Sequence, residues 1–104
     1  MDDILKTVES VINNYDSGAY IPIEKLTGML RELTGGIYHL TVIHTKASEE
    51  HNAYQYNFSG SVARGLIEAD FEVPEYKMTR KILDTCNRVQ SAMIMELSIL
   101  KREM

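Results

Sequence analysis

The stretch "TGGIYHLTVIHTKA", residues 34–47, decides the fold because it fits two different structures. Two adjacent glycines followed by isoleucine, tyrosine, threonine and valine are typical of a turn that leads into a β-strand. A hairpin of residues 37–45 with residues 53–59 would then give a small α+β domain. The same residues also fit one face of a long helix, and that alternative gives an all-α protein.

The spacing of side chains on both sides of this stretch favours the helix. Steps of three and four residues alternate without a break, whereas a strand has a period of two. We therefore predict a helix through residues 34–47, with a kink or break at Gly35–Gly36, because each glycine costs a helix roughly 1 kcal/mol relative to alanine. The residues of this stripe are Leu26, Leu30, Leu33, Ile37, Leu40, His44, Ala47, His51, Tyr54 and Phe58.

A second helical pattern covers the C-terminal part of the chain. The proline ring disfavours helical geometry at Val73, so Pro74 is expected to be the first residue of this helix. Ile94, Met95 and Ile99 widen its apolar stripe enough to face two neighbouring helices. We expect self-association through this stripe, because a chain this short buries only a modest core alone. The residues assigned to oligomerisation are Ile82, Cys86, Val89, Met93, Leu97 and Leu100.

The remaining segments complete one domain of residues 1–104. Residues 2–18, "DDILKTVESVINNYDSG", carry an apolar stripe and end in Gly18, a typical helix stop. Residues 58–75 contain Gly60 and Gly65 and are expected to be irregular, although Val62, Leu66 and Ala69 could extend the helix. The prediction is an all-α fold of two or three long amphipathic helices in an oligomeric bundle, with the α+β fold as its alternative.

The composition excludes several classes of protein. With one cysteine, Cys86, the chain forms no intramolecular disulfide, which fits a reducing cytoplasm. No apolar run approaches the roughly 20 residues that span a bilayer, and the N-terminal "MDDILKTVE" differs from a secretory signal. The formal net charge of −4 argues against a uniformly basic nucleic-acid-binding domain but leaves room for a local basic stripe. We expect a cytoplasmic protein that does not enter a membrane.

The sequence lacks the usual motifs of catalysis and metal binding. None of its three histidines lies four residues from another, so the helical pair of metal ligands is absent. Neither phosphate-binding glycine pattern, GxxxxGK[ST] or GxGxxG, occurs. His44 and His51 lie on the helical stripe and are interpreted as polar layers of an interface, and Cys86 is interpreted as a core residue. We expect no enzyme, no cofactor and no metal.

A stripe of positive charge on one flank of the last helix is the remaining functional signal. It is interrupted by Asp84, and one interpretation is a solvated face with local salt bridges. The other is a row of phosphate contacts for single-stranded DNA, with Tyr54 or Tyr56 stacking on bases and Arg64 as a further cation. The residues of the stripe are Lys77, Arg80, Lys81 and Arg88.

The C-terminal half of the chain resembles the UvsY-type recombination mediators of tailed phages. The similar segments are "AYQYNFSGS", residues 53–61, and "IEADFEVPEYKMTRKILDTCNRVQSAMIMELSILKREM", residues 67–104. Shared elements are an aromatic–Ser–Gly motif, a segment that ends in Ala-Asp, and a long helix that contains "ILDTC". The matching residues are Tyr54, Phe58, Ser59, Gly60, Ala69, Asp70, Val73, Leu83, Asp84 and Cys86.

This resemblance implies a helical homo-oligomer that binds single-stranded DNA in the host cytoplasm. Such mediators are not enzymes; they help load a RecA-like recombinase onto strands coated by a single-strand-binding protein. Two alternatives stay open. The chain could be a small acidic phage protein that inhibits or titrates a host defence factor, because carboxylates can imitate phosphates. It could also be a structural adaptor whose helices only assemble.

Overall fold

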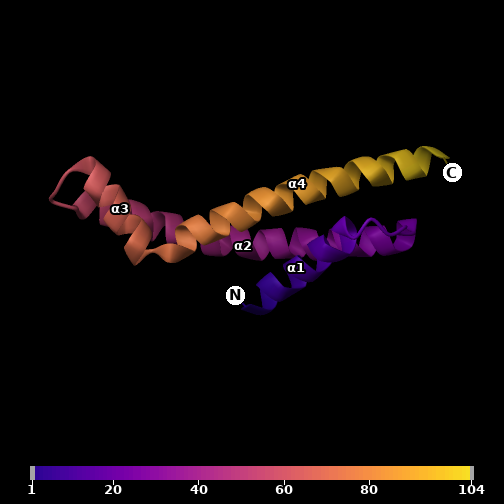
Figure 1. Ribbon diagram of the computed structural model, residues 1–104, viewed down its shortest axis with the longest axis horizontal. Helices are drawn as coiled ribbons and strands as arrows, with labels where there is room; N and C mark the ends of the chain where they lie inside the picture. The colour runs from indigo at the N-terminus through magenta and orange to yellow at the C-terminus, as the bar shows by residue number, and fades with distance from the viewer. Residues whose placement is uncertain (1, 104) are drawn as a thin grey trace.

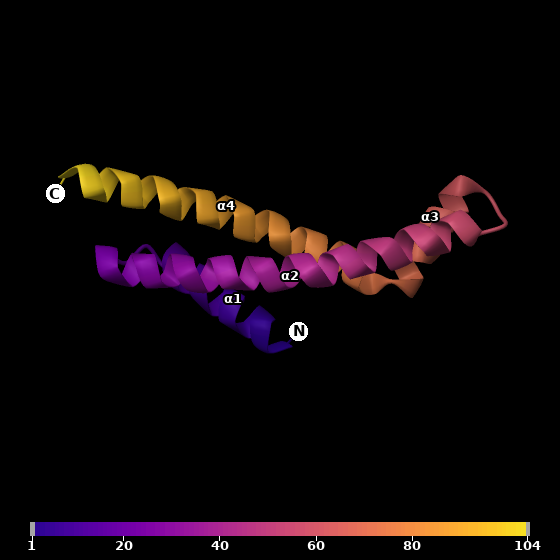
Figure 2. The same cartoon turned by 180° about the vertical axis from the view of Figure 1, so that it is seen from behind.

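A computed structural model of the protein describes residues 2–103 and contains four α-helices in this range. The two long helices, α2 and α4, run antiparallel, and α1 packs along the first half of α2 (Figure 1). The shorter α3 lies at one end of an elongated molecule of 61 × 25 × 20 Å, and the opposite view shows the same arrangement (Figure 2). The helices are α1 (Asp2–Asp16), α2 (Ile23–Asn57), α3 (Val62–Glu72) and α4 (Pro74–Glu103).

The opening stretch, residues 34–47, is helical throughout, which confirms the all-α prediction. The alternative hairpin is wrong, because residues 37–45 and 53–57 belong to one continuous helix. The helix also continues through Gly35 and Gly36, so the predicted break does not occur there.

The predicted stripe of α2 forms the centre of the core. Leu26, Leu33 and Leu40 are fully buried, and the same face continues through Ala47 to His51. These side chains pack against α4 and α1, so the apolar residues at alternating spacings of three and four find their packing partners within a single chain. The largest of the fully buried side chains are Leu26, Leu33, Leu40, Met93, His51, Val8, Thr79 and Cys86.

The residues that we assigned to oligomerisation lie inside this core instead. Cys86, Val89, Met93 and Leu97 are buried, while Ile82 and Leu100 are partly buried against the same cluster. At these positions α4 packs against α1 and α2 of its own chain, and not against another subunit as predicted. This packing within one chain is possible because α2 is long enough to supply the complementary apolar stripe. The residues left exposed on α4 are Ile94, Met95 and Ile99, at 53%, 66% and 49%.

The segment expected to be irregular contains the additional helix α3. Ser61 caps its N-terminus, since the Ser61 hydroxyl accepts a hydrogen bond of 3.2 Å from the Arg64 backbone N–H. Ala69 is completely buried and Gly65 is buried beside the ring of Phe58, which holds α3 against the end of α2. Pro74 begins α4 as predicted.

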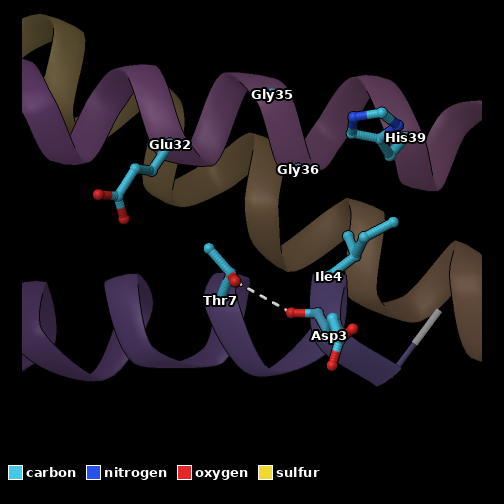
Figure 3. A pocket seen from close by; sticks show the side chains of 7 residues that line it. All are labelled: Asp3, Ile4, Thr7, Glu32, Gly35, Gly36 and His39. Carbon is cyan, nitrogen blue, oxygen red and sulfur yellow. Dashed lines mark hydrogen bonds between the residues drawn. The ribbon is translucent and has the colours of Figure 1, made fainter.

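The two central glycines of α2 have opposite surroundings. Figure 3 shows them above α1, beside a pocket whose other lining residues come from both helices. A Cβ atom added at Gly36 would clash with Cγ2 of Val8, a buried and β-branched side chain that has little freedom to move. A Cβ atom added at Gly35 would meet no atom within 4 Å. Gly36 therefore permits the close approach of α1, whereas Gly35 does not contribute to it.

We predict that Gly35→Ala and Gly36→Ala change stability in opposite directions. Gly35→Ala should raise the free energy of unfolding by about 1 kcal/mol, which is the gain in helix propensity. Gly36→Ala makes the same gain but forces α1 outward, and overpacking costs roughly 1–3 kcal/mol. We therefore expect a net loss of about 1 kcal/mol for Gly36→Ala. Urea unfolding followed by far-UV circular dichroism measures both, and equal stabilisation by the two variants would contradict the prediction.

Candidate functional site

The predicted basic stripe lies on the outer face of α4 and divides into two parts. Arg80, Lys81 and Arg88 are exposed, and no ion pair involves them within residues 2–103. Lys77 is different, because its Nζ lies 2.9 Å from Oδ2 of Asp70. The interpretation as a face of local salt bridges therefore applies to Lys77. The other three cations are free to meet an external anion.

The orientation of these three cations differs from the sequence expectation. Successive residues of a helix are rotated by about 100°, which places Arg80, Lys81 and Arg88 opposite the buried Cys86 and Met93. Arg88 and Arg80 project away from the core, whereas Lys81 lies at the edge of α4 that faces α1 and lines a pocket there. Asp84 interrupts the same row, as predicted. We call the exposed cations Arg80, Lys81 and Arg88 the α4 basic row.

The other predicted DNA-contacting residues form a separate group where α2 turns into α3. Tyr56 is 90% exposed at the end of α2 and lines a small pocket with Ser61 and Gly65. Arg64 is exposed in the first turn of α3. Tyr54 is half-buried and stacks on Phe58, with ring centroids 6.4 Å apart. Tyr56 and Arg64 are therefore accessible to a ligand, whereas Tyr54 is already engaged.

A polar cluster that the sequence did not predict connects three helices. His51 of α2 is only 2% exposed, and its Nε2 lies 2.7 Å from Oδ1 of Asp70 in α3. The second carboxylate oxygen of Asp70 forms an ion pair with Lys77 of α4. Hydrogen bonds from Lys77 first, and then from His51, hold the pKa of Asp70 below its ordinary value. Asp70 is therefore a carboxylate to which the Nε2–H of His51 donates.

An aromatic stack lies next to this cluster. The ring of Tyr76 stacks on His51 with centroids 4.2 Å apart and on His44 with centroids 5.3 Å apart. His44 Nδ1 lies 2.7 Å from the buried Thr79 hydroxyl, whose own proton is donated to the Glu75 carbonyl at 2.6 Å. Thr79 must therefore accept from His44, which fixes the proton of His44 on Nδ1. Both histidines are polar layers of the α2–α4 interface, as their spacing predicted.

The chemistry of this cluster is structural rather than catalytic. The His51 ring is buried and covered by Tyr76, so a substrate has no access to it. Its buried Nδ1 has no hydrogen-bond partner among the described residues. Cys86 is equally inaccessible, and burial raises the pKa of its thiol. The Asp70 carboxylate instead ties α3 to both long helices. This role matters because the buried residues of α3 are the small Gly65 and Ala69, which contribute little apolar contact.

The lowered pKa of Asp70 predicts a specific loss of stability in acid. An aspartate whose folded pKa lies below its ordinary value of 3.8 stabilises the fold above that pH. The contribution disappears as the pH falls through the folded pKa, because Asp70 is then protonated in both the folded and the unfolded state. We expect Asp70→Asn to be less stable than the wild type at neutral pH and equally stable in strong acid.

Urea unfolding at a series of pH values tests this expectation. Asp84→Asn is the matched control, since it removes an exposed carboxylate that takes part in no ion pair within residues 2–103. It should track the wild type at every pH. A constant difference between Asp70→Asn and the wild type across the whole pH range would show that the ion pairs are not its cause.

Further features of the described chain bear on the type of site. Across residues 2–103, no three histidine, cysteine, aspartate or glutamate side chains come together in a way that could hold a metal ion. None of the helices in this range has both the length and the apolar character needed to cross a membrane. Comparison with known proteins finds no matching family model, no matching curated protein and no matching solved structure.

Proposed function

We propose that this protein is a non-enzymatic recombination mediator that assembles into oligomers and binds single-stranded DNA. The observation that carries the proposal is the α4 basic row, which is exposed and free of ion pairs within the described residues. Contacts to phosphates are independent of base sequence, as a protein that coats strands requires. The exposed ring of Tyr56 and the nearby Arg64 supply a second place where a strand can stack and bind.

Assembly is required for this function because one subunit has few free cations. The formal net charge is −4, so a single α4 basic row would hold a strand weakly against the repulsion of the remaining surface. When several copies hold the same strand, each later contact forms at a high effective concentration. Ile94, Met95 and Ile99 continue the outer face of α4 beyond the basic row and offer an apolar surface for assembly.

The recombinase step of the proposal rests on the resemblance in the C-terminal half of the chain. The residues that carry it include the turn at Ser59–Gly60, Asp70 of the polar cluster and Cys86 of the core. In this view the protein loads a RecA-like recombinase onto strands coated by a single-strand-binding protein, in the cytoplasm of a phage-infected host. The turn and the long helix α4 correspond to the shared elements of that family.

The wild-type protein tests the DNA-binding step directly. Fluorescence anisotropy of a labelled oligo-dT should report binding at low salt that weakens steeply as salt is added. Each phosphate neutralised on a single strand contributes roughly −0.7 to the slope of log K against log salt, so three contacts per subunit give about −2. Binding that is insensitive to salt would contradict contacts through the basic row.

A second function follows from the acidic balance of the chain. Aspartate and glutamate number 15 against 11 lysines and arginines, and such a surface can imitate nucleic acid toward a host defence protein. Absence of binding to oligo-dT at any salt concentration, together with saturable binding to a host protein, would favour this inhibitor over the mediator.

A further inference from the structure

Lys77 has the position of a fourth member of the α4 basic row but not its freedom. It lies three and four residues before Arg80 and Lys81, a spacing that places neighbouring side chains on one side of a helix. Its side chain is 70% exposed, so solvent and ions reach it. Its ammonium nevertheless forms the ion pair with Asp70 of α3, with Nζ 2.9 Å from Oδ2. One cation beside the row is thus paired with a carboxylate of the same chain.

Asp70 is held in the place where it meets Lys77. Its other carboxylate oxygen accepts a hydrogen bond of 2.7 Å from Nε2 of His51, whose side chain is 2% exposed. The Asp70 side chain is only 19% exposed, and salt screens the charge of a partly buried pair less than that of an open one. A strand of DNA, by contrast, loses conformational freedom when one of its phosphates is fixed beside a side chain. Asp70 therefore has an advantage over a phosphate in the competition for Lys77.

We propose that Asp70 acts as an internal phosphate mimic that withholds Lys77 from single-stranded DNA. This inference rests on the proposed function, since it concerns how strongly the α4 basic row binds a strand. The three cations of the row meet phosphates while Lys77 stays with Asp70. Because Asp70 belongs to α3, a displacement of that helix would release Lys77 and give the row a fourth cation. The position of α3 thereby sets the affinity of each subunit for DNA.

Neutralisation of two lysines of α4 tests whether Lys77 is withheld. Lys77→Gln and Lys81→Gln remove the same charge from exposed side chains four residues apart. Fluorescence anisotropy of labelled oligo-dT at about 50 mM salt should show a loss of roughly five- to tenfold for Lys81→Gln, which is the effect of one phosphate contact. Lys77→Gln should bind within about twofold of the wild type, because no phosphate contact is lost. An equal loss in both variants would show that Lys77 leaves Asp70 for the strand, and this would overturn the proposal.

Release of Lys77 should strengthen binding. Asp70→Asn removes the charge of the carboxylate and leaves Lys77 intact, so it should bind oligo-dT roughly five- to tenfold more tightly at low salt. The slope of log K against log salt should become steeper by about 0.7, as expected for one further phosphate contact. Lys77→Gln in the Asp70→Asn background should abolish this gain. The single and the double variant both lack the ion pair, so a loss of stability affects them alike, and far-UV circular dichroism checks that both keep their helices.

A control variant and the wild type distinguish the remaining outcomes. Glu49→Gln changes the net charge as much as Asp70→Asn does, but Glu49 lies on the face of α2 opposite the buried His51 and should bind like the wild type. An equal gain in Glu49→Gln, or a gain that survives in the double variant, would overturn the role of Asp70. Absence of oligo-dT binding by every protein of the series would overturn the proposed function itself. Binding without the differences expected here would overturn only the withholding of Lys77.

Discussion

The double variant Arg80→Glu/Lys81→Glu is expected to lose binding to single-stranded oligo-dT by about a hundredfold at low salt, because two phosphate contacts become repulsive. Both side chains are exposed, so folding and helicity should be unchanged. The slope of log K against log salt should also become shallower, since fewer counterions are released on binding. Lys77 is left intact because its reversal would disrupt the ion pair with Asp70.

A matched control variant distinguishes the effect of the α4 basic row on DNA binding from the effect of the net charge. Lys25→Glu/Arg31→Glu reverses two exposed cations of α2 and changes the formal net charge by the same amount. It should bind oligo-dT within a small factor of the wild type. If both double variants lose binding equally, net charge rather than the α4 basic row controls the interaction. If neither loses binding, the DNA contacts lie elsewhere, and Tyr56 with Arg64 become the next residues to vary.

The second large effect is expected for a buried charge on α4. Leu97 is 6% exposed in the core cluster, so Leu97→Asp removes apolar contacts and buries a carboxylate that has no partner. Loss of the leucine packing alone costs about 2–5 kcal/mol, and burial of the charge adds to this. For a domain with a total stability of roughly 5–15 kcal/mol, the variant should be largely unfolded or strongly destabilised.

Thermal unfolding and urea denaturation measure this loss, and a neighbouring position supplies the control. Met95 lies two residues away and is 66% exposed, so Met95→Asp adds the same charge without burying it. At protein concentrations too low for assembly, this control should unfold like the wild type. Equal stability of Leu97→Asp and Met95→Asp would contradict the placement of Leu97 in the core of a single chain.

Much of the fold could be predicted from the spacing of apolar residues. The unbroken series from Leu26 to Phe58 predicted one long helix, and that series outweighed the two glycines that are typical of turns. Helix α3 was foreseen only as an alternative, through Val62, Leu66 and Ala69, because Gly60 and Gly65 favoured an irregular segment. Ser61 directly before the apolar Val62 was the available signal for its N-terminus. The role of Gly65 against Phe58 depends on tertiary contact and leaves no local pattern.

The candidate site was predictable only in part. The cations of α4 could be grouped by their spacing, but their position relative to the core depended on which face of α4 is covered by α1 and α2. Asp70, Tyr76 and Lys77 could not be connected to His51 in advance. These four residues come from three helices, and the segment of one of these helices was expected to be irregular. The same limit applied to the oligomerisation surface, because periodicity cannot tell whether an apolar stripe packs within one chain or between chains.

The stack of Tyr76 between His44 and His51 has a consequence for how α2 and α4 align. An antiparallel pair of helices lined with leucine, methionine and valine at heptad spacing would pack almost as well after sliding by one repeat. Such a slide would remove Tyr76 from its place between the two rings and separate His51 from Asp70. It would also separate His44 from Thr79, leaving buried polar groups without partners. The polar layers thus select one register among several that the apolar side chains alone would allow.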